Sequence, residues 1–403
     1  MIAKINPSEI HGEITAPPSK SMAHRFIICA ALSKGVSVVD NIAYSDDIMA
    51  TLSCIEALGA KVVRNENSVT IEGIDAKTAS PNAPLYAGES GSTLRFLIPT
   101  ALLSGNKTEF YGKERLFERP LEVYDKIAKE NGLHFEKKKD GLAVCGPIKS
   151  GTYRIDENKS SQFISGLLFA LPLLCGDSEI ILSEYPESKP YIDMTLFALG
   201  EFGINVYFDG EKTFRIPGNQ TFRAKNVAVE GDFSNAAFFE ALNLVGGNVE
   251  VLGINKDTLQ GDAVFFDYFE KIKKGNPTLD ISQCPDLAPI LMVLLSECGG
   301  GTLTGTSRLK FKESDRGEVM RCELSKLGAE ISIYENSIVV ANTALHAPAE
   351  RIFSNGDHRV VMSMAVLLTK YGGSIIGCED CKKSMPGFFG KLKMLGADIL
   401  ITE

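Results

Sequence analysis

Apolar positions along the chain form two alternating kinds of helical segment. Segments of the first kind are apolar almost all round, which predicts helices buried among other elements. Segments of the second kind repeat their apolar positions every 3.6 residues and keep a polar side, which predicts amphipathic helices with one face in solvent. The first kind comprises residues 22–34, 93–104, 162–175, 235–245, 286–298 and 358–370, and the second comprises 46–58, 122–131, 193–202, 263–274, 317–327 and 388–395.

Glycines divide the chain into six similar stretches. A glycine followed by a β-like run recurs at intervals of 53 to 73 residues, and a second glycine lies 24 to 29 residues after each of them. Most of the second glycines end an amphipathic segment, where a left-handed C-cap favours a residue without a Cβ. Six copies of one helix–strand–helix–strand unit explain this pattern. The first glycines are Gly35, Gly105, Gly176, Gly246, Gly299 and Gly372, and the second are Gly59, Gly132, Gly203, Gly275, Gly328 and Gly396.

Three such units would fill a lobe of about 200 residues. Helices that are apolar all round fit a closed lobe better than an open solenoid, in which each repeat contacts only its neighbours. We therefore predict a mixed α/β protein of two similar lobes. The first lobe comprises residues 15–228, and the second comprises 229–403 together with the leading strand 1–14, which has no unit of its own.

Composition and charge narrow the class of protein. Apolar residues make up 44% of the 403 residues and charged residues 23%, as in ordinary soluble proteins. The net charge of −9 makes the chain a poor nucleic-acid binder, unless its cations gather in one place. No apolar stretch reaches the roughly 18 residues of a membrane span, and the first residues lack the apolar core of a secretion signal. We therefore expect a cytoplasmic protein without nucleic-acid or membrane partners.

The cysteine and histidine residues do not form a recognisable metal site. Nine cysteines, odd in number and scattered, indicate reduced thiols rather than a disulfide framework. Cys378 and Cys381 form a single CxxC pair without a nearby histidine, so two ordinary thiols are favoured over a zinc or redox site. The five histidines show no metal-ligand spacing, and the chain contains no GxxxxGK[ST] phosphate loop.

Cations recur where the predicted helices begin. A helix N-terminus carries partial positive charge, so a cation there is disfavoured by about 0.3–1 kcal/mol. Each one alone is explained by solvation, but the repetition in an acidic chain favours a shared anion site built from cations and helix starts. These cations are Lys20, Arg25, Arg95, Arg115, Arg119, Lys312, Arg316, Arg359, Lys382 and Lys383.

Two acidic residues lie among these cations. Asp286 precedes a strongly apolar helix and fits an N-cap, whereas Glu313 fits an ion-pair partner of its basic neighbours. The chemical alternative is that two carboxyl groups at one site divide acid and base work between them. The serines of Ser160-Ser161-Gln162 likewise fit either a helix cap or donors to a phosphate group.

An ordered set of motifs resembles the enolpyruvyl transferases from end to end. The motifs are SKSMAHR, SDD, ESGSTLR, RLFERP, SSQF, SKPYID, EGDFSNA, LQGD, CPDLAP, KESDR, NGDHR and KSMP. The resemblance implies two lobes, each of three βαβαββ units with the helices inside (an inside-out α/β barrel). It also implies that the active site lies in the cleft between the lobes.

The same resemblance implies a reaction. The enolpyruvyl group of phosphoenolpyruvate would pass to the 5-hydroxyl group of shikimate 3-phosphate through a tetrahedral ketal, with release of phosphate, on the route to chorismate and the aromatic amino acids. Asp286 would take the hydroxyl proton and Glu313 would donate a proton, with Lys20 and Lys312 beside the substrates. This chemistry needs no metal or organic cofactor, and we expect a monomer.

The resemblance also assigns binding residues motif by motif. Those implied for shikimate 3-phosphate are Lys20, Ser21, Arg25, Ser160, Ser161, Gln162, Ser188, Tyr191, Asp286 and Lys312. Those implied for phosphoenolpyruvate are Lys20, Gly91, Arg115, Gln162, Arg316, Arg359 and Lys383.

Some positions depart from the usual pattern of the family. Glu89 stands where many relatives have Asn, and Phe96 where many have Pro, so the affinity for phosphoenolpyruvate and the response to glyphosate are open. One rival function is that of the sister enzyme acting on UDP-N-acetylglucosamine, which has Lys-Asn in place of Lys20-Ser21 and a loop cysteine that residues 111–120 lack. A second rival is a non-catalytic anion-binding scaffold, against which the two carboxylates argue, because an anion receptor gains nothing from burying them.

Overall fold

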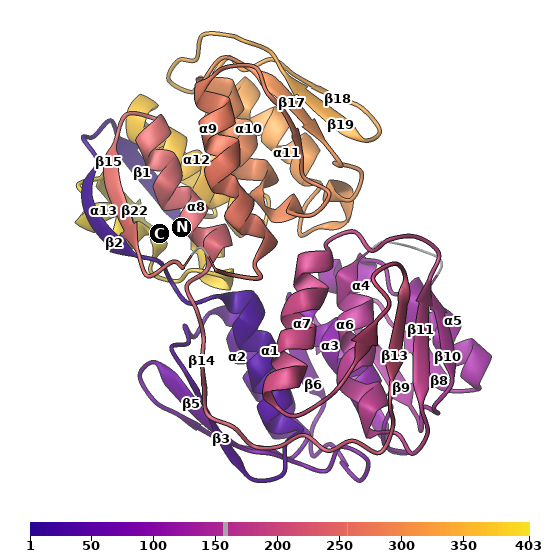
Figure 1. Cartoon of the computed structure of the whole chain (residues 1–403). Helices are drawn as coiled ribbons and strands as arrows, with labels where there is room; N and C mark the ends of the chain where they lie inside the picture. The colour runs from indigo at the N-terminus through magenta and orange to yellow at the C-terminus, as the bar shows by residue number, and fades with distance from the viewer. Residues whose placement is uncertain (156–159, 256) are drawn as a thin grey trace. The chain divides into compact units, whose positions relative to one another are not determined.

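The chain folds into two compact units, shown in the computed structural model of Figure 1. The structure describes residues 1–155, 160–255 and 257–403. The first lobe comprises Pro18–Glu230, and the second lobe comprises Met1–Pro17 and Gly231–Glu403. These boundaries fall within three residues of those expected from the repeats.

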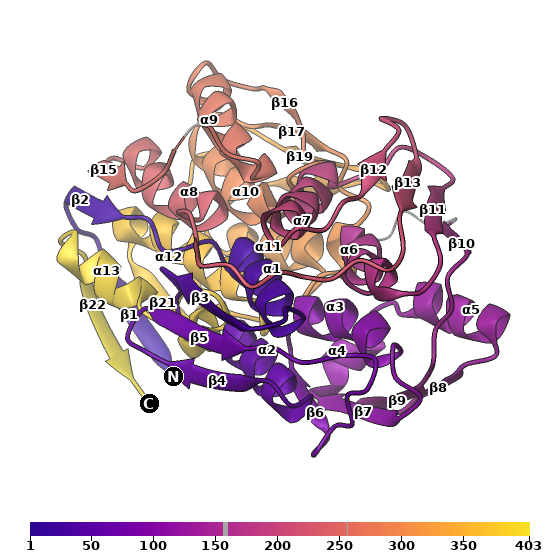
Figure 2. The ribbon, with the colours of Figure 1, turned by 60° about the horizontal axis from the view of Figure 1, so that its bottom comes forward.

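Three four-stranded sheets with one common plan build the first lobe. In each sheet two strands pair in parallel, and a hairpin then adds two antiparallel strands. The first sheet, β14–β3–β5–β4, joins the last strand of the lobe to its first, and its strands β3, β5 and β4 can be followed in Figure 2. The strands are β3 (Val36–Asp40), β4 (Lys61–Arg64), β5 (Ser68–Glu72), β6 (Leu85–Gly88), β7 (Lys107–Gly112), β8 (His134–Lys137), β9 (Gly141–Cys145), β10 (Thr152–Ile155), β11 (Ser178–Leu182), β12 (Tyr207–Phe208), β13 (Thr213–Ile216) and β14 (Val227–Ala228).

Two sheets of the second lobe follow the same plan, and the lobe incorporates the start of the chain. Its sheets are β16–β17–β19–β18, β20–β21–β1–β22 and the pair β15–β2. The leading strand β1 lies between β21 and β22, antiparallel to both, so it completes a sheet whose other strands lie near the C-terminus. The strands are β1 (Ile2–Asn6), β2 (His11–Thr15), β15 (Asn248–Leu252), β16 (Thr278–Asp280), β17 (Gly301–Thr304), β18 (Ile331–Ile333), β19 (Ser337–Val340), β20 (Ile352–Phe353), β21 (Gly373–Ile376) and β22 (Asp398–Thr402).

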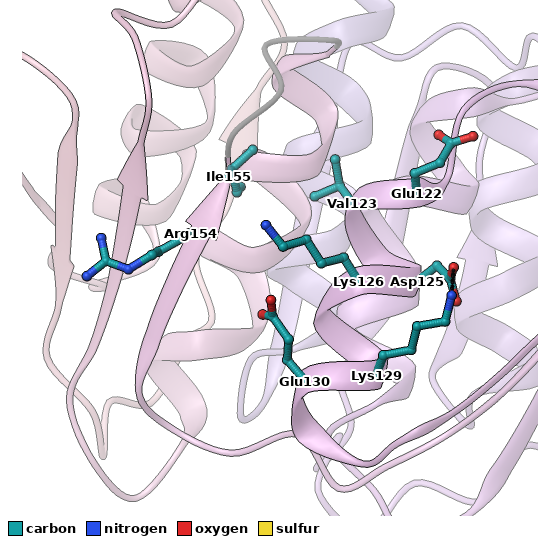
Figure 3. Close-up of a pocket in the computed structure, with 8 residues that line it drawn as sticks. All are labelled: Glu122, Val123, Asp125, Lys126, Lys129, Glu130, Arg154 and Ile155. Atoms are coloured by element: carbon teal, nitrogen blue, oxygen red, sulfur yellow. Dashed lines mark hydrogen bonds and ion pairs between the residues drawn. The ribbon is translucent and has the colours of Figure 1, made fainter.

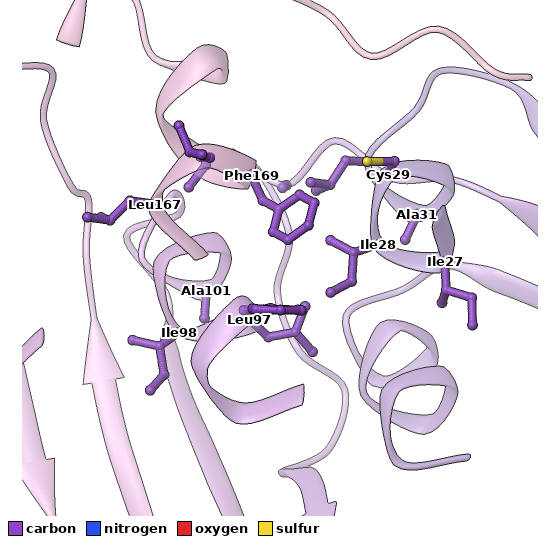
Figure 4. Packing of buried hydrophobic residues seen from close by; sticks show 14 of the residues in the cluster. Ile27, Ile28, Cys29, Ala31, Leu97, Ile98, Ala101, Leu167 and Phe169 are labelled. Carbon is purple, nitrogen blue, oxygen red and sulfur yellow. The ribbon is translucent and has the colours of Figure 1, made fainter. Parts of the chain in front are cut away.

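Helices that are apolar all round form the interior of each lobe, as their sequences predict. Residues of three of them, among them Ile28, Leu97 and Phe169, gather in one core in Figure 4. These inner helices are α1 (Lys20–Ala31), α3 (Gly91–Ala101) and α6 (Ser161–Ala170) in the first lobe, and α8 (Phe233–Ala241), α10 (Ala288–Glu297) and α12 (His358–Tyr371) in the second.

The amphipathic segments form helices that keep exposed faces. They are α2 (Asp46–Ala57), α5 (Glu122–Asn131), α7 (Lys189–Glu201), α9 (Phe265–Lys273), α11 (Arg316–Ser325) and α13 (Phe388–Met394). Shorter turns precede or follow several helices: α4 (Glu114–Glu118), and the 3₁₀ turns η1 (Leu171–Leu173), η2 (Leu242–Leu244), η3 (Gly261–Val264), η4 (Pro285–Leu287), η5 (Leu309–Phe311) and η6 (Cys378–Lys383).

The repeated glycine after each amphipathic helix has the left-handed conformation expected of it. Gly132, for example, is the C-cap of α5 with φ 65° and ψ 32°. All six glycines of this set have positive φ, where a Cβ would be strained. The mixed α/β fold of repeated units is therefore confirmed. Among the described residues no helix is long and apolar enough to cross a membrane.

Candidate active site

Asp286 lies at the centre of a charged cluster in the second lobe. It is part of η4, and its carboxylate accepts hydrogen bonds from Lys312 Nζ (3.1 Å), Arg316 (2.7 Å) and Arg359 (3.2 Å). Arg359 also donates to the backbone carbonyl of Asp286 at 3.0 Å. The N-cap interpretation of Asp286 is wrong, because α10 begins after η4 with no side-chain cap. Its carboxylate therefore pairs with the three cations instead of capping α10.

Arg316 joins this carboxylate to two others. It is the first residue of α11 and only 1% exposed, and its guanidinium also donates to Glu313 (2.6 Å) and to Asp357 (2.9 Å). Asp357 is in turn the N-cap of α12 and accepts from the backbone N–H of Arg359 at 2.9 Å. The starts of α11 and α12 are thus fixed to each other by charge-assisted hydrogen bonds.

The electrostatics of the cluster keep Asp286 ionised. Burial alone would raise the pKa of its carboxyl group, but Arg359, Lys312 and Arg316 outweigh burial and hold that pKa well below its ordinary value. Burial lowers the pKa of Lys312 despite the attraction of Asp286. In this state Asp286 is a weak base, because the three cations stabilise its ionised form.

Glu313 has a second cation near it. Lys383, at the end of η6, places its Nζ 3.9 Å from the Glu313 carboxylate, and both side chains are largely buried. Cys378 and Cys381 begin and continue the same turn, and burial raises the pKa of both thiols, that of Cys381 to about 12. Both are therefore protonated at neutral pH. Among the described residues, no group of three or more His, Cys, Asp or Glu side chains could hold a metal ion.

Asp262 is a further buried acid that sequence reasoning missed. It lies in η3 within the LQGD motif, and burial, followed by the charge of Asp286, raises its pKa to about 6. A hydrogen bond from Gln260 to the Gly231 carbonyl (2.7 Å) holds this segment against the start of α8. The motif was visible in the sequence, but nothing there signalled burial beside Asp286.

We expect Asp262→Asn to raise the melting temperature at pH 7.5. A carboxyl group whose pKa is raised on folding binds its proton more tightly in the folded state, so stability falls as pH rises from about 4 to 6 and stays lower above. Asparagine does not titrate and avoids this loss. Melting curves of both proteins between pH 4 and 8 check the prediction: the gain should vanish toward pH 4, and a variant that is less stable at pH 7.5 would contradict it.

Arg25 is the central cation of the first lobe. It lies in α1 and is 3% exposed, and its guanidinium donates to Thr195 Oγ1 (2.8 Å) and to the backbone carbonyls of Ser21 (2.6 Å) and Tyr191 (2.7 Å). All three acceptors are neutral, and within the described ranges no carboxylate bonds to this guanidinium. Burial lowers its pKa to about 10. A buried cation held only by neutral groups is suited to receive an anion.

A buried polar chain connects the starts of three helices of the first lobe. Lys20, the first residue of α1, is paired with Asp47 of α2 at 2.8 Å. His24 Nδ1 lies 2.7 Å from Thr51 Oγ1, which lies 2.6 Å from Thr93 Oγ1 of α3. Burial lowers the pKa of His24 to about 3, so the ring is neutral and positions its neighbours. This series of polar contacts fixes Lys20 relative to the start of α3.

Ser160-Ser161-Gln162 both caps helix α6 and contacts helix α3. Ser160 is the N-cap of α6 and accepts from the backbone N–H of Gln162 at 3.3 Å, so the cap interpretation of Ser160 is correct. The Gln162 side chain donates to Ser92 (3.0 Å) and accepts from Arg95 (2.7 Å), which ties α6 to α3. Ser188, just before α7, is buried in a left-handed conformation with φ 53°.

Arg115 and Arg119, which belong to the same motif, differ in exposure: Arg115 faces solvent, whereas Arg119 is buried next to Gly91. Arg115 lies in α4 with a side chain that is 49% exposed and pairs with Glu118 at 3.1 Å. Arg119 is buried, and a Cβ placed on Gly91 would lie 2.8 Å from its Nη1. Arg119 Nε has no hydrogen-bond partner among the described residues. The exposed side chain of Arg115 does not fit the predicted role in binding phosphoenolpyruvate. The buried side chain of Arg119, next to Gly91, has the position expected of a residue that binds an anion.

The unusual acid Glu89 is neutralised locally. Lys113, the residue before α4, places its Nζ 2.5 Å from the Glu89 carboxylate. The carboxylate thus has a cation of its own next to the Gly91 loop. This pairing lessens the repulsion that Glu89 would otherwise exert on an anionic ligand.

A pocket of about 400 Å³ in the first lobe is lined by none of the predicted site residues. Residues of α5 and β10 line it, among them both acidic and basic side chains (Figure 3). Lys129 is paired with Asp125 at 2.6 Å, and Arg154 points away from α5. Its mixed charges select no single class of ligand.

Comparison with known proteins identifies the family. The sequence profile of the EPSP synthase family (3-phosphoshikimate 1-carboxyvinyltransferase) matches residues 5–392. The chain is 39% identical to the 3-phosphoshikimate 1-carboxyvinyltransferase of Clostridium kluyveri, with 98% of this chain and 97% of that protein covered. It is 37% identical to the protein of the same name from Clostridioides difficile, with 98% of each covered. A solved EPSP synthase structure from Acinetobacter baumannii shares the fold, with a TM-score of 0.79 and 24% identity over the whole of both chains. The chain, with its two lobes of repeated units and its clusters of buried cations, belongs to the EPSP synthase family.

Proposed function

We propose that this chain carries out the reaction of its family through the two charged clusters described above. The enolpyruvyl group of phosphoenolpyruvate passes to the 5-hydroxyl group of shikimate 3-phosphate, and phosphate is released. One observation supports the proposal most strongly: the buried guanidinium of Arg316 donates hydrogen bonds to both Asp286 and Glu313. Two carboxyl groups with different partners at one site are suited to divide base and acid work.

The first lobe supplies most of the proposed contacts to shikimate 3-phosphate. Arg25, with its neutral partners, meets the phosphate group, and Lys20 lies five residues earlier on the same helix. The remaining contacts are assigned to Ser21, Ser160, Ser161, Gln162, Ser188 and Tyr191, with Asp286 and Lys312 reaching the same substrate from the second lobe.

Phosphoenolpyruvate is assigned to cations of both lobes. Arg316, Arg359 and Lys383 begin or precede helices of the second lobe, and Lys20, Gly91 and Gln162 belong to the first. We assign Arg119 to this group in place of Arg115, because Arg119 is buried against Gly91 and Arg115 faces solvent. The two clusters then act on one pair of substrates.

The chemistry follows from the charges. The enol carbon of phosphoenolpyruvate is a poor electrophile until its methylene group is protonated, and Glu313 is the proposed proton donor. Asp286 takes the 5-hydroxyl proton as the new C–O bond forms. The deprotonated Glu313 then takes a methyl proton back from the resulting ketal, which re-forms the C=C bond and breaks the C–O bond to phosphate. Fixed cations stabilise the charge that moves in both steps.

Substrate binding also explains how Asp286 becomes a base. In the free protein three cations hold its pKa low. Anionic groups of the substrates compete for Lys312 and Arg359, so part of this attraction is withdrawn from Asp286 and its proton affinity rises. The base is therefore strongest when both substrates are present.

The test is a phosphate-release assay with the purified protein. We expect phosphate to appear only when shikimate 3-phosphate and phosphoenolpyruvate are supplied together. Release with UDP-N-acetylglucosamine in place of shikimate 3-phosphate would assign the chain to the sister reaction. Absence of release with either acceptor would support the scaffold alternative. The cytoplasmic location, the monomeric state and the independence from cofactors remain predictions from the sequence.

A further inference from the structure

The guanidinium of Arg25 is held so that part of it remains available. Arginine has five N–H donors in a rigid fork. Three of them bond to Thr195, Ser21 and Tyr191, which involve Nε and one hydrogen on each terminal nitrogen. One N–H on each terminal nitrogen is thereby left over among the described contacts. These two remaining donors can bind oxygens of an anionic group such as a phosphate.

A phenyl ring lies against this fork. The Arg25 guanidinium carbon is 5.1 Å from the centre of the Phe96 ring, within the range of a cation–π interaction. Phe96 is 1% exposed on α3, and its ring meets Phe169 of α6 edge-on at 5.4 Å. The ring is therefore fixed by the core on one side and contacts the cation on the other.

We propose that Phe96 is a positioning residue that holds the Arg25 fork in the orientation that receives the phosphate group of shikimate 3-phosphate. This proposal rests on the proposed function, since it takes shikimate 3-phosphate as the ligand of Arg25. No carboxylate among the described residues orients this guanidinium, so its orientation depends on three neutral acceptors and the ring face. The negative face of the ring stabilises the cation and excludes water from that side of the fork.

A purely structural role for Phe96 predicts a different outcome from a positioning role. Phe169 is the control, because it is buried in the same core and packs against the Phe96 ring. No contact between Phe169 and Arg25 occurs among the described residues. Phe169→Leu and Phe96→Leu remove a phenyl ring from adjacent sites and open similar space in the core. Only Phe96→Leu removes the surface under the guanidinium.

The experiment measures the dissociation constant of shikimate 3-phosphate by calorimetry for the wild type and both variants. We expect Phe96→Leu to weaken binding by about tenfold, in line with a desolvated cation–π interaction, and Phe169→Leu to change it less than about twofold. Phe96→Met, which also lacks the ring, should weaken binding as much as Phe96→Leu and serves if the leucine variant folds poorly. The NMR signal of the Arg25 Nε–H group should lose its ring-current shift in both Phe96 variants.

The possible outcomes separate this inference from the function on which it rests. If the wild type does not bind shikimate 3-phosphate, the proposed function fails. If the wild type binds and the Phe96 variants bind equally well or more tightly, the positioning role is overturned while the function stands. Equal weakening in Phe96→Leu and Phe169→Leu would also overturn it, because core packing alone would then account for the loss.

Discussion

Glu313→Gln is expected to lower kcat by about 10²- to 10⁴-fold, the usual contribution of general acid–base catalysis. The glutamine side chain has the same shape, and its carbonyl oxygen still accepts the hydrogen bond that Arg316 now donates to Glu313 at 2.6 Å. The carboxamide cannot deliver a proton to the methylene carbon of phosphoenolpyruvate. Binding of shikimate 3-phosphate, measured by calorimetry, should therefore change little while turnover falls.

Glu318→Gln is the matched control for this substitution. Glu318 is also paired with an arginine three residues away on α11, but its side chain is 49% exposed. Its loss should leave kcat within about twofold of the wild type. A Glu313→Gln enzyme with normal turnover and weakened substrate binding would mean that Glu313 is only an ion-pair partner of Arg316.

Arg119→Ala is expected to lower kcat/KM for phosphoenolpyruvate by about 10²-fold or more. Charge-assisted hydrogen bonds contribute about 1.5–3 kcal/mol each, and a guanidinium makes two to an anionic group. The buried position of Arg119 against Gly91 makes it the candidate for such a pair. Steady-state kinetics with varied phosphoenolpyruvate at saturating shikimate 3-phosphate measures the effect.

Arg115→Ala is the control from the same motif. Because the Arg115 side chain is half-exposed and pairs only weakly at the surface with Glu118, its removal should change kcat/KM by less than about twofold. The assignment of Arg119 would be wrong if Arg115→Ala had the larger effect. Equal effects would indicate that the loss of any positive charge near this loop weakens binding.

Hydrophobic periodicity was sufficient to predict the helices and the repeated units. Segments that are apolar all round, such as α12, can be stable only inside a core, and the glycines that follow the amphipathic segments need positive φ. The place of β1 between β21 and β22 is a different matter, because it joins residues almost 400 positions apart. Local sequence carries no information on such a pairing.

The limits of the sequence were clearest where a side chain's direction decides its role. Arg115 and Arg119 belong to one short motif, and only the turn at α4 and the following Pro120 determines that Arg119 is the buried one. The same is true of Asp286, whose neighbouring residue Pro285 begins a 3₁₀ turn and moves the carboxylate away from the cap position. Residue types predicted the chemistry, whereas backbone geometry selected the residues.

The acidic net charge and the anionic substrates are compatible because the cations are concentrated. In the second lobe Arg316, Arg359 and Lys312 share one carboxylate, and in the first lobe Arg25 has only neutral partners. A surface that is negative on average therefore does not prevent anion binding at these buried groups. What matters is the local field at the helix starts.

We propose that cations of both lobes act on the same two substrates. A crystal structure of the Glu313→Gln variant with shikimate 3-phosphate and phosphoenolpyruvate tests it directly, because slow turnover preserves both ligands. We predict that phosphoenolpyruvate contacts Arg119 from the first lobe together with Arg316 and Arg359 from the second, while Arg25 holds the phosphate of shikimate 3-phosphate. Ligands held by residues of one lobe alone would contradict this proposal.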